Sequence, residues 1–181
     1  MPKRKAADRD VSDQPARQRE IVLIAHNLRS THNVGSLLRT ADGLGLTGVF
    51  LTGYTPYPAA AQDSRLPHVR DKIHKQIHKT ALGAESSINW QHSASLEPVL
   101  QSLRQNNFTI ACLEQSPQSL WLSNYQAPQR LALIVGREVE GLEAEVLADA
   151  DVILQIPMAG AKESFNVVQA AAMALYHLTY L

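Results

Sequence analysis

The sequence contains very little cysteine and no long apolar run. Cys112 is the single cysteine among 181 residues, so no disulfide can form within the chain, and this favours a reducing compartment. No apolar stretch is long enough to span a bilayer, and the opening stretch lacks the apolar core of a signal peptide. We therefore expect a cytoplasmic protein with no membrane partner.

The sequence also lacks an excess of charge of either sign. Its 17 Lys and Arg residues formally cancel its 17 Asp and Glu residues at pH 7. The overall charge therefore does not mark the chain as a nucleic-acid binder. RNA binding would have to rely on a local basic patch or on the groove of a dimer.

Residues 1–19 contain many charges and few large apolar side chains. Such a composition buries too little apolar surface to fold, so we expect a disordered tail. The segment PKRK within it is best explained as a solvated stretch, with a nuclear-import signal or an RNA-contacting arm as alternatives. Residues 20–181 are long enough for one domain with a full core.

From residue 20 onward, short apolar runs alternate with segments of helical periodicity. The expected strands are residues 21–26, 47–53, 87–91, 108–114, 131–136 and 151–156, and the expected helices are residues 33–45, 95–105, 142–149 and a final helix from near Ser164. This alternation predicts an α/β fold in which helices cover both faces of a parallel sheet. Ligands of such sheets bind at the carboxyl ends of the strands. The candidate loops are therefore residues 26–35, 53–60, 113–120, 136–141 and 157–164.

A first polar cluster, HNLRSTHNVGSLLRTAD, follows the first expected strand. Asn33 can cap the next helix, and Gly35 permits the close approach of another backbone. Arg39 lies farther along the same helix. Taken alone it is a surface residue, a partner of Asp42 or a functional residue.

A second cluster, IVGREVEGLEAEVL, joins a strand to a helix. Gly136 ends the strand, Gly141 opens the helix, and Glu138 and Glu140 lie between them. Acidic residues are favoured near a helix start by its dipole, so these carboxylates need no further role. The cluster is not a phosphate-binding loop, because neither GxGxxG nor GxxxxGK[ST] occurs.

A third cluster, MAGAKESFNVVQAAAMALYHL, opens the final helix. Ser164 or Asn166 can act as its cap. The helix is rich in Ala and Val nearly all round, which predicts burial against the sheet or against a second subunit.

Together, the three clusters resemble, in order and spacing, the signature motifs of the SpoU (TrmH) family of RNA 2′-O-ribose methyltransferases, within the SPOUT superfamily. The matching positions are Asn33, Gly35, Arg39 and Thr40 in the first motif, Gly136, Glu138, Gly141 and Leu142 in the second, and Ile156, Pro157, Met158, Gly160, Ser164, Asn166 and Val167 in the third. The segment KTALGAE, residues 79–85, also resembles a stretch of the family. The resemblance extends over residues 20–181.

The resemblance implies a parallel-sheet SPOUT fold with a C-terminal deep trefoil knot, a feature that is very rare and that composition does not predict. It also implies a homodimer without a metal, in which S-adenosylmethionine methylates a ribose 2′-hydroxyl of tRNA or rRNA. The implied cofactor contacts are Leu113, Gly136, Ile156, Met158, Phe165 and Asn166.

The implied catalytic residues are Arg39, Asn33, Glu138, Ser164 and Asn166. Proposals for the family make the arginine a general base, but a guanidinium with a pKa above about 12 is poorly suited to that role. We expect Arg39 to act as a cation that orients an RNA phosphate and stabilises the developing alkoxide. The other four residues would fix Arg39 and the ribose by hydrogen bonds.

The sequence departs from the family pattern in the second motif, where Arg137 and Val139 replace the common Asn and Gly. A β-branched residue resists positive φ, so the loop cannot use a glycine conformation at position 139. The role of Arg137 stays open, with contact to an RNA phosphate as one option. The stretch between Thr55 and Lys79 is longer than usual, and we expect no added N-terminal RNA-binding domain and no long helical extension.

Local cations are the expected source of RNA affinity. They are Lys3, Arg4, Lys5, Arg17 and Arg19 in the tail and the basic residues between Arg65 and Lys79. An alternative is a catalytically inactive SPOUT-fold protein that only binds RNA. A nucleotide-dependent enzyme such as a dehydrogenase is disfavoured by the missing glycine fingerprint.

Five further residues have simpler explanations than chemistry. His74 and His78 have a metal-like spacing on a helix, but no third ligand is evident, so a solvated basic face is favoured. Cys112 is expected to be a small core residue. Trp121 and Tyr125 are expected to cover the core rather than to stack on bases.

Overall fold

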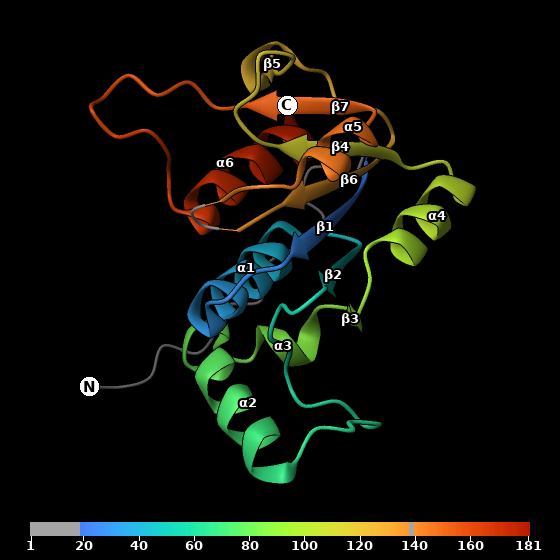
Figure 1. Cartoon of the computed structure of the whole chain (residues 1–181), viewed down its shortest axis with the longest axis vertical. Helices are drawn as coiled ribbons and strands as arrows, with labels where there is room; N and C mark the ends of the chain where they lie inside the picture. The colour runs from blue at the N-terminus through green and yellow to red at the C-terminus, as the bar shows by residue number, and fades with distance from the viewer. Residues whose placement is uncertain (1–18, 138–139) are drawn as a thin grey trace, which may run out of the picture.

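One parallel sheet lies at the centre of the protein (Figure 1). The computed structural model describes residues 19–137 and 140–181. Within them the strands are β1 (Glu20–His26), β2 (Gly48–Thr52), β3 (Trp90–Ser93), β4 (Thr109–Leu113), β5 (Leu120–Trp121), β6 (Arg130–Val135) and β7 (Val152–Gln155). Their order is β3-β2-β1-β6-β4-β7-β5, and each of these neighbours pairs in parallel. The predicted α/β class with a parallel sheet is confirmed, whereas the predicted tail, except for Arg19, lies outside the described residues.

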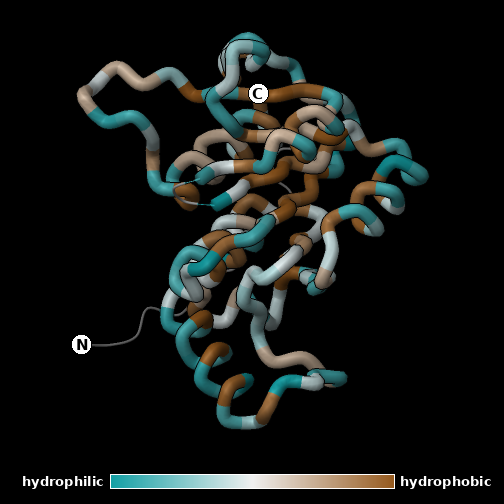
Figure 2. Tube along the Cα trace, in the orientation of Figure 1, coloured by the Kyte–Doolittle hydropathy of each residue, from teal (hydrophilic) through white to brown (hydrophobic). Residues whose placement is uncertain are grey.

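The central strand β1 is buried on both faces. Ile21, Leu23 and Ala25 contribute to one apolar cluster, and Val22 and Ile24 contribute to the other, because successive side chains of a strand point to opposite faces. Strands buried in this way are continuous apolar runs rather than alternating ones. Figure 2 shows the result, with apolar segments concentrated in the middle of the molecule.

Helices cover the two faces of the sheet. On one face α1 (Thr31–Leu44) and α6 (Val167–Tyr180) pack against the strands, and α2 (Pro67–Ala81) packs on α1 together with α3 (Ala84–Ser87). The other face is covered by α4 (Glu97–Gln105) and α5 (Ala144–Ala148). A short 3-10 turn, Leu122–Asn124, follows β5.

Helix α1 begins at Thr31, earlier than predicted. Ser30 is its N-cap, and the Oγ of Ser30 accepts a hydrogen bond from the backbone N–H of Asn33 at 3.2 Å. The prediction that Asn33 caps this helix is therefore wrong. Asn33 lies within the first turn and supplies the N–H that the cap satisfies.

Gly35 lies where α1 meets α2. A Cβ at this position would collide with the Oγ1 of Thr80 and the carbonyl oxygen of Ile77, and it would approach the backbone nitrogen of Ala81 to 3.0 Å. The predicted close backbone approach at Gly35 is confirmed, and its partner is the C-terminal turn of α2.

Helix α2 occupies part of the stretch that the sequence pattern left without a helix. Only Ile73, Ile77 and Ala81 of this helix contribute to the apolar cluster, so its periodicity is weak. Pro67 begins the helix, at a position where its missing N–H costs nothing. Since α2 packs on α1 rather than on the sheet, a narrow apolar stripe is sufficient.

Helix α6 begins at Val167 rather than near Ser164, and Asn166 is its cap, with Oδ1 accepting from the N–H of Val168 at 2.9 Å. Its inner face is fully buried and contains Ala171, Ala174, Leu175 and Leu178. Its outer face exposes Met173, Tyr176 and Tyr180 by 40%, 53% and 41%. The single chain thus buries the inner face of α6 against the sheet, and the predicted burial of its outer face against a second subunit stays a prediction. None of the helices in the described ranges has the length and apolar content needed to cross a membrane.

Candidate active site

A cleft opens at the carboxyl ends of β4, β6 and β7. It encloses about 810 Å³, part of which is continuous with solvent, and this is within the range of small-molecule sites. Leu113, Gly136, Ile156, Met158 and Phe165, the five predicted cofactor contacts other than Asn166, all line it, as does Ser164. Three of the candidate loops therefore converge on one cleft.

Gly136 allows the turn after β6 to pack tightly. A Cβ there would lie 2.8 Å from Cγ and Cδ2 of Leu142 and 2.9 Å from the backbone carbon of Gly141. These distances are too short for real carbon atoms, so any larger residue would push the turn away from α5. The wall of the cleft at this point must consist of backbone.

Two polar residues at the end of β4 join the loops around the cleft. The carboxylate of Glu114 accepts from the backbone N–H of Leu142 at 3.1 Å and from the N–H of Gln115 at 2.9 Å. The Nε2 of Gln115 donates to the carbonyl oxygen of Glu163 at 2.7 Å. Glu114 therefore holds the second-motif turn, and Gln115 holds the third-motif loop.

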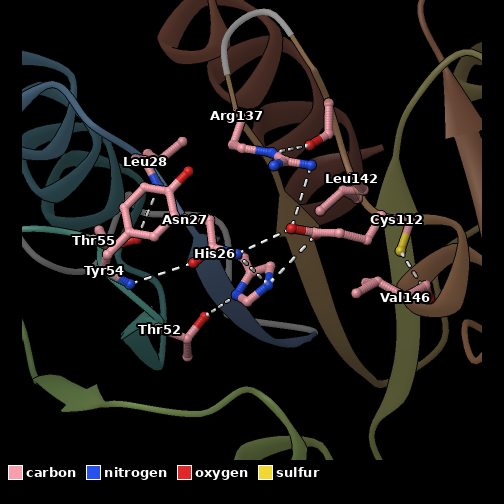
Figure 3. A network of polar contacts seen from close by, with 12 residues as sticks. His26, Asn27, Leu28, Thr52, Tyr54, Thr55, Cys112, Arg137, Leu142 and Val146 are labelled. Atoms are coloured by element: carbon pink, nitrogen blue, oxygen red, sulfur yellow. Dashed lines mark hydrogen bonds and ion pairs between the residues drawn. The ribbon is translucent and has the colours of Figure 1, made fainter.

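A second polar network lies at the ends of β1 and β2 (Figure 3). The Nδ1 of His26 lies 2.9 Å from the Oγ1 of Thr52, and its Nε2 lies 3.0 Å from the Nδ2 of Asn27. Asn27 also donates to Glu143 at 3.1 Å, and Arg137 pairs with the same carboxylate oxygen at 3.3 Å. The network thereby ties the start of the first-motif segment to the turn of the second motif.

Burial lowers the pKa of His26, and the neighbouring Glu143 only partly opposes this effect. The neutral ring then accepts from Asn27 at Nε2 and donates from Nδ1 to Thr52. Burial by itself would raise the pKa of Glu143, but hydrogen bonds from its own backbone N–H and from Asn27, together with the charge of Arg137, hold that pKa below its ordinary value.

Arg137 closes the second-motif turn. Its backbone carbonyl accepts from the N–H of Gly141 at 3.2 Å, and its Nε donates to the carbonyl oxygen of Gly141 at 3.3 Å. Together with its ion pair to Glu143, this places Arg137 in the wall of the cleft. The substitution that departs from the family pattern therefore has a structural role within the chain.

Arg39 lies outside the cleft, in a shallow open groove that it shares with Lys79, Thr80 and Val168. It forms no ion pair with any of the described residues, and the nearby Asp42 accepts a hydrogen bond from the Oγ of Ser87 at 2.7 Å. Val167 lines the cleft while Val168 lines this groove. The first turn of α6 therefore separates the two hollows.

The remaining predicted catalytic residues are spread around the first turns of α1 and α6. Asn33 is in the first turn of α1, and Asn166 caps α6 without lining the cleft. Glu138 lies outside the described residues, as does Val139. Ser164 is the one member of the predicted catalytic set that lines the cleft in the described chain.

The residues expected to lack a chemical role have other partners. His78 pairs with Glu85, and the Nδ1 of His74 accepts from the N–H of Ala59 at 3.3 Å. Across residues 19–137 and 140–181, no group of three or more His, Cys, Asp or Glu side chains is arranged to hold a metal. Cys112 is fully buried, and burial raises the pKa of its thiol to about 12, which confirms a core role.

The two aromatic residues after β4 differ in their surroundings. Tyr125 packs against the larger apolar cluster, and its carbonyl oxygen lies 3.0 Å from the Nε2 of His177. Its predicted role as cover for the core is confirmed. Trp121, on the edge strand β5, is 46% exposed and covers the core less than predicted.

Several residues around the cleft and the network were not recognised from the sequence, namely Glu114, Gln115, His26, Asn27 and Glu143. A usable signal existed for the first four, because each is a polar residue at the end of an apolar run, where ligands of parallel sheets bind. Glu143 shows no such signal, since an acidic residue before a helix is common for electrostatic reasons alone.

Comparison with known proteins identifies the class. The chain matches the model of the SpoU rRNA Methylase family over residues 20–176, and it belongs to this family. The family recognised from the three motifs is thus confirmed.

Two curated relatives and one solved structure illustrate the similarity. The chain is 26% identical over 160 residues to the tRNA (guanosine(18)-2'-O)-methyltransferase of Borreliella burgdorferi, covering 87% of this chain and 65% of the relative. It is 27% identical over 164 residues to the 23S rRNA (guanosine-2'-O-)-methyltransferase RlmB of Haemophilus influenzae, covering 90% of this chain and 60% of the relative. It superposes on the AdoMet-bound rRNA methyltransferase from Sinorhizobium meliloti with a TM-score of 0.74 at 21% identity, covering 87% of this chain and 55% of that one. The chain thus spans less than two thirds of the length of these curated relatives.

Proposed function

We propose that this protein transfers a methyl group from S-adenosylmethionine to a ribose 2′-hydroxyl of tRNA or rRNA. The observation that carries the proposal is the cleft at the ends of β4, β6 and β7. Five of the six residues expected to contact this cofactor line it. The curated relatives, which are named as tRNA and rRNA 2'-O-methyltransferases, support the same reaction. No observation favours the inactive RNA-binding alternative.

The residues of the cleft fit S-adenosylmethionine chemically. Leu113, Ile156, Met158 and Phe165 offer apolar surface for a purine and a thioether chain, and Gly136 leaves backbone groups accessible. When bound, S-adenosylmethionine supplies an electrophilic methyl group on a sulfonium. The apolar side chains would hold the bound group beside the entering ribose, an effect of positioning that can contribute several kcal/mol.

Arg39 is the residue that acts on the hydroxyl. Its exposed guanidinium, free of ion pairs among the described side chains, can hold an RNA phosphate and stabilise the oxygen as it loses its proton. Asn33, Glu138, Ser164 and Asn166 orient Arg39 and the ribose by hydrogen bonds in this proposal. The hydroxyl oxygen would accept the methyl group of S-adenosylmethionine, and the hydroxyl proton would leave to solvent through the open groove beside Arg39.

The protein acts as a homodimer in this proposal. The outer face of α6 exposes Met173, Tyr176 and Tyr180 in one row, and a contiguous apolar row of this kind is typical of an interface. A second copy also resolves the separation of Arg39 from the cleft, because it can present its own Arg39 to a ribose held at the cleft. Light scattering at micromolar concentration should give twice the chain mass, and a stable monomer would contradict the proposal.

Shared sites can be tested by mixing two inactive variants. Arg39→Ala removes the cation, and Gly136→Val fills the turn at the cleft. Co-expressed chains that regain part of the activity would support one site built from two subunits. Co-expressed chains that form mixed dimers but stay inactive would refute it.

Lysines of α2 provide the proposed RNA track. Lys72, Lys75 and Lys79 lie on one exposed face at helical spacing, and Lys79 reaches the groove of Arg39. None of the three forms an ion pair with the described residues. Phosphates that follow this row would lead the RNA strand to Arg39.

Not every basic residue of this segment is available to RNA. The guanidinium of Arg65 donates hydrogen bonds to the carboxylate of Asp63 and to the carbonyl oxygens of Tyr57 and Pro58. Its central carbon also lies 3.6 Å from the centre of the Tyr57 ring. Arg65 therefore shapes the loop before α2, and the expectation that it contacts RNA is not supported by this geometry. Arg70 pairs with Asp71 at 2.9 Å, which weakens its attraction for a phosphate.

The proposal includes three further features of the chain. The C-terminal segment threads through a loop as a deep trefoil knot, the protein acts in the cytoplasm, and residues 20–181 form the methyltransferase domain. The match to the SpoU rRNA Methylase family supports the first. A crystal structure traced through residues 113–181 tests the knot directly.

Methyl transfer from labelled S-adenosylmethionine to bulk tRNA and rRNA tests the function as a whole. Ribose methylation should appear in one RNA class, and mapping the modified nucleotides in cells with and without the protein should identify the site. Cofactor binding without transfer to any cellular RNA would favour the inactive alternative. Absence of cofactor binding would refute the proposed function itself.

A further inference from the structure

Glu114 is a carboxylate in the wall of the cleft that the proposed reaction does not yet use. It follows β4 directly and lines the cleft beside Leu113 and Gly136. Carboxylates at the end of a parallel strand are well placed to meet a bound nucleoside.

The orientation of this carboxylate is set by the backbone. One oxygen accepts from the N–H of Gln115 and the other accepts from the N–H of Leu142. An ionised carboxyl group has about four acceptor positions, two on each oxygen. Each oxygen of Glu114 therefore keeps an acceptor position for a ligand.

The second-motif turn is built around the same carboxylate. Gly141 has φ of +68°, and a Cβ on it would collide with Oε2 of Glu114. Position 141 must thus be glycine for two reasons, the backbone conformation and the space that Glu114 occupies. A turn that leaves this room keeps the carboxylate at the cleft rather than displacing it into solvent.

The arrangement selects one kind of ligand group. Two oxygens side by side, each with one remaining acceptor position, match two neighbouring O–H donors such as those of a ribose. The same cleft also presents the apolar side chains of Leu113, Ile156 and Met158, which suit a base and a thioether. A single ammonium group donates from one nitrogen only, so it matches two separate acceptor oxygens less well than two hydroxyl groups do.

We propose that Glu114 binds the 2′- and 3′-hydroxyls of the adenosyl ribose and makes the cleft specific for ribonucleoside cofactors. This inference rests on the proposed function, since it assumes an adenosyl ligand in the cleft. Gln115 is a positioning residue in the same device, because its bond to the carbonyl oxygen of Glu163 holds the third-motif loop beside the bound ribose.

Binding calorimetry on the full chain tests the proposal without any measurement of activity. The ligands are S-adenosylhomocysteine, 5′-methylthioadenosine, which keeps the ribose and lacks the amino acid, and 3′-deoxy-5′-methylthioadenosine. Glu114→Gln should weaken both ribose ligands by about 10-fold or more, the range expected for hydrogen bonds to a charged group. The variant should lose less affinity for the 3′-deoxy ligand, because that ligand keeps only the 2′-hydroxyl as a donor to Glu114.

Glu140→Gln is the matched control, since Glu140 also lines the cleft but pairs with Arg29. It should leave the preference for ribose over 3′-deoxyribose unchanged. A Glu114→Gln protein that loses affinity equally for all three ligands would reveal a purely structural carboxylate and would overturn the proposal. A loss seen with S-adenosylhomocysteine but not with 5′-methylthioadenosine would assign Glu114 to the amino-acid part and overturn it too.

The same titrations of the wild-type protein distinguish the proposed function from the role of Glu114. A wild-type protein that binds neither S-adenosylhomocysteine nor 5′-methylthioadenosine would refute the proposed function. A wild-type protein that binds both, with no preference for ribose over 3′-deoxyribose, would refute only the role of Glu114.

Discussion

Gly35 offers a sharp test of how α1 and α2 are held together. Replacing it with Ala adds a methyl group where the Oγ1 of Thr80 and the carbonyl oxygen of Ile77 already lie. Because one obstacle is backbone, the strain can be relieved only by moving α2 as a unit. Gly43, in the same helix, has nothing within 4 Å of the place where an added methyl group would lie, so Gly43→Ala is the matched control.

The two alanine substitutions should change the free energy of unfolding in opposite directions. Overpacking costs about 1–3 kcal/mol, and contact with backbone favours the upper end. Helix propensity returns about 1 kcal/mol when Gly becomes Ala, so Gly35→Ala should lower stability by about 2 kcal/mol. For a chain of this size that corresponds to a Tm decrease of about 4–8 °C. Gly43→Ala should instead raise stability by about 0.4–1 kcal/mol.

Thermal unfolding followed by circular dichroism, with urea titration as a second probe, separates the two variants. The Gly35→Ala protein should also bind RNA less well, because Thr80 and Lys79 share a groove with Arg39. Its affinity for S-adenosylhomocysteine should not change, since the cleft lies on the other side of α6's first turn. Equal stability of the two alanine variants would refute the close contact between α1 and α2.

Three further predictions follow from the site. Arg39→Ala should abolish methyl transfer while S-adenosylmethionine affinity stays within a few-fold, and an equal loss of both would contradict the assigned role. Reversing the charges of Lys72, Lys75 and Lys79 should weaken RNA binding and flatten its dependence on salt by about one unit of slope for each lost phosphate contact, and deletion of residues 1–19 should act in the same direction. An unchanged slope would show that these cations are merely solvated. Burial lowers the pKa of His26, so the unfolded chain binds a proton that the folded chain resists, and stability should fall as the pH drops below 6.5, its ordinary pKa; His26→Asn should reduce this slope between about pH 7 and 5 in urea titrations, and an unaltered slope would exclude His26 as its source.

The parallel sheet could be predicted because its signal is local. A strand buried on both faces needs a continuous apolar run, and IVLIAH, residues 21–26, contains little else. Helix α2 could not be predicted in this way. It packs on another helix through Ile73, Ile77 and Ala81, so most of its positions are polar and its periodicity is faint.

The capping residues show a similar limit. Asn33 and Ser30 are both good caps, and the choice between them depends on where the chain leaves β1. The backbone of Asn27 turns there with φ of +56°, and the N–H of Leu28 bonds to the Oγ1 of Thr55, a residue far along the chain. The helix start is thus set by contacts that no local pattern contains.

The sequence by itself determined the family, through three motifs in their order, and the resemblance to that family implied Leu113, Gly136, Ile156 and Met158 as cofactor contacts. The structure brings these four residues to one cleft because the ends of their strands meet at one edge of the sheet. Only the tertiary structure decided that Arg39 lies in a separate groove and that Glu114 is held between two loops. The spacing of apolar residues along a helix or strand indicates which face of that element is buried, since neighbouring residues share one backbone geometry. It does not record which distant backbone N–H a side chain will meet, because that partner is selected by the packing of the whole sheet and its helices.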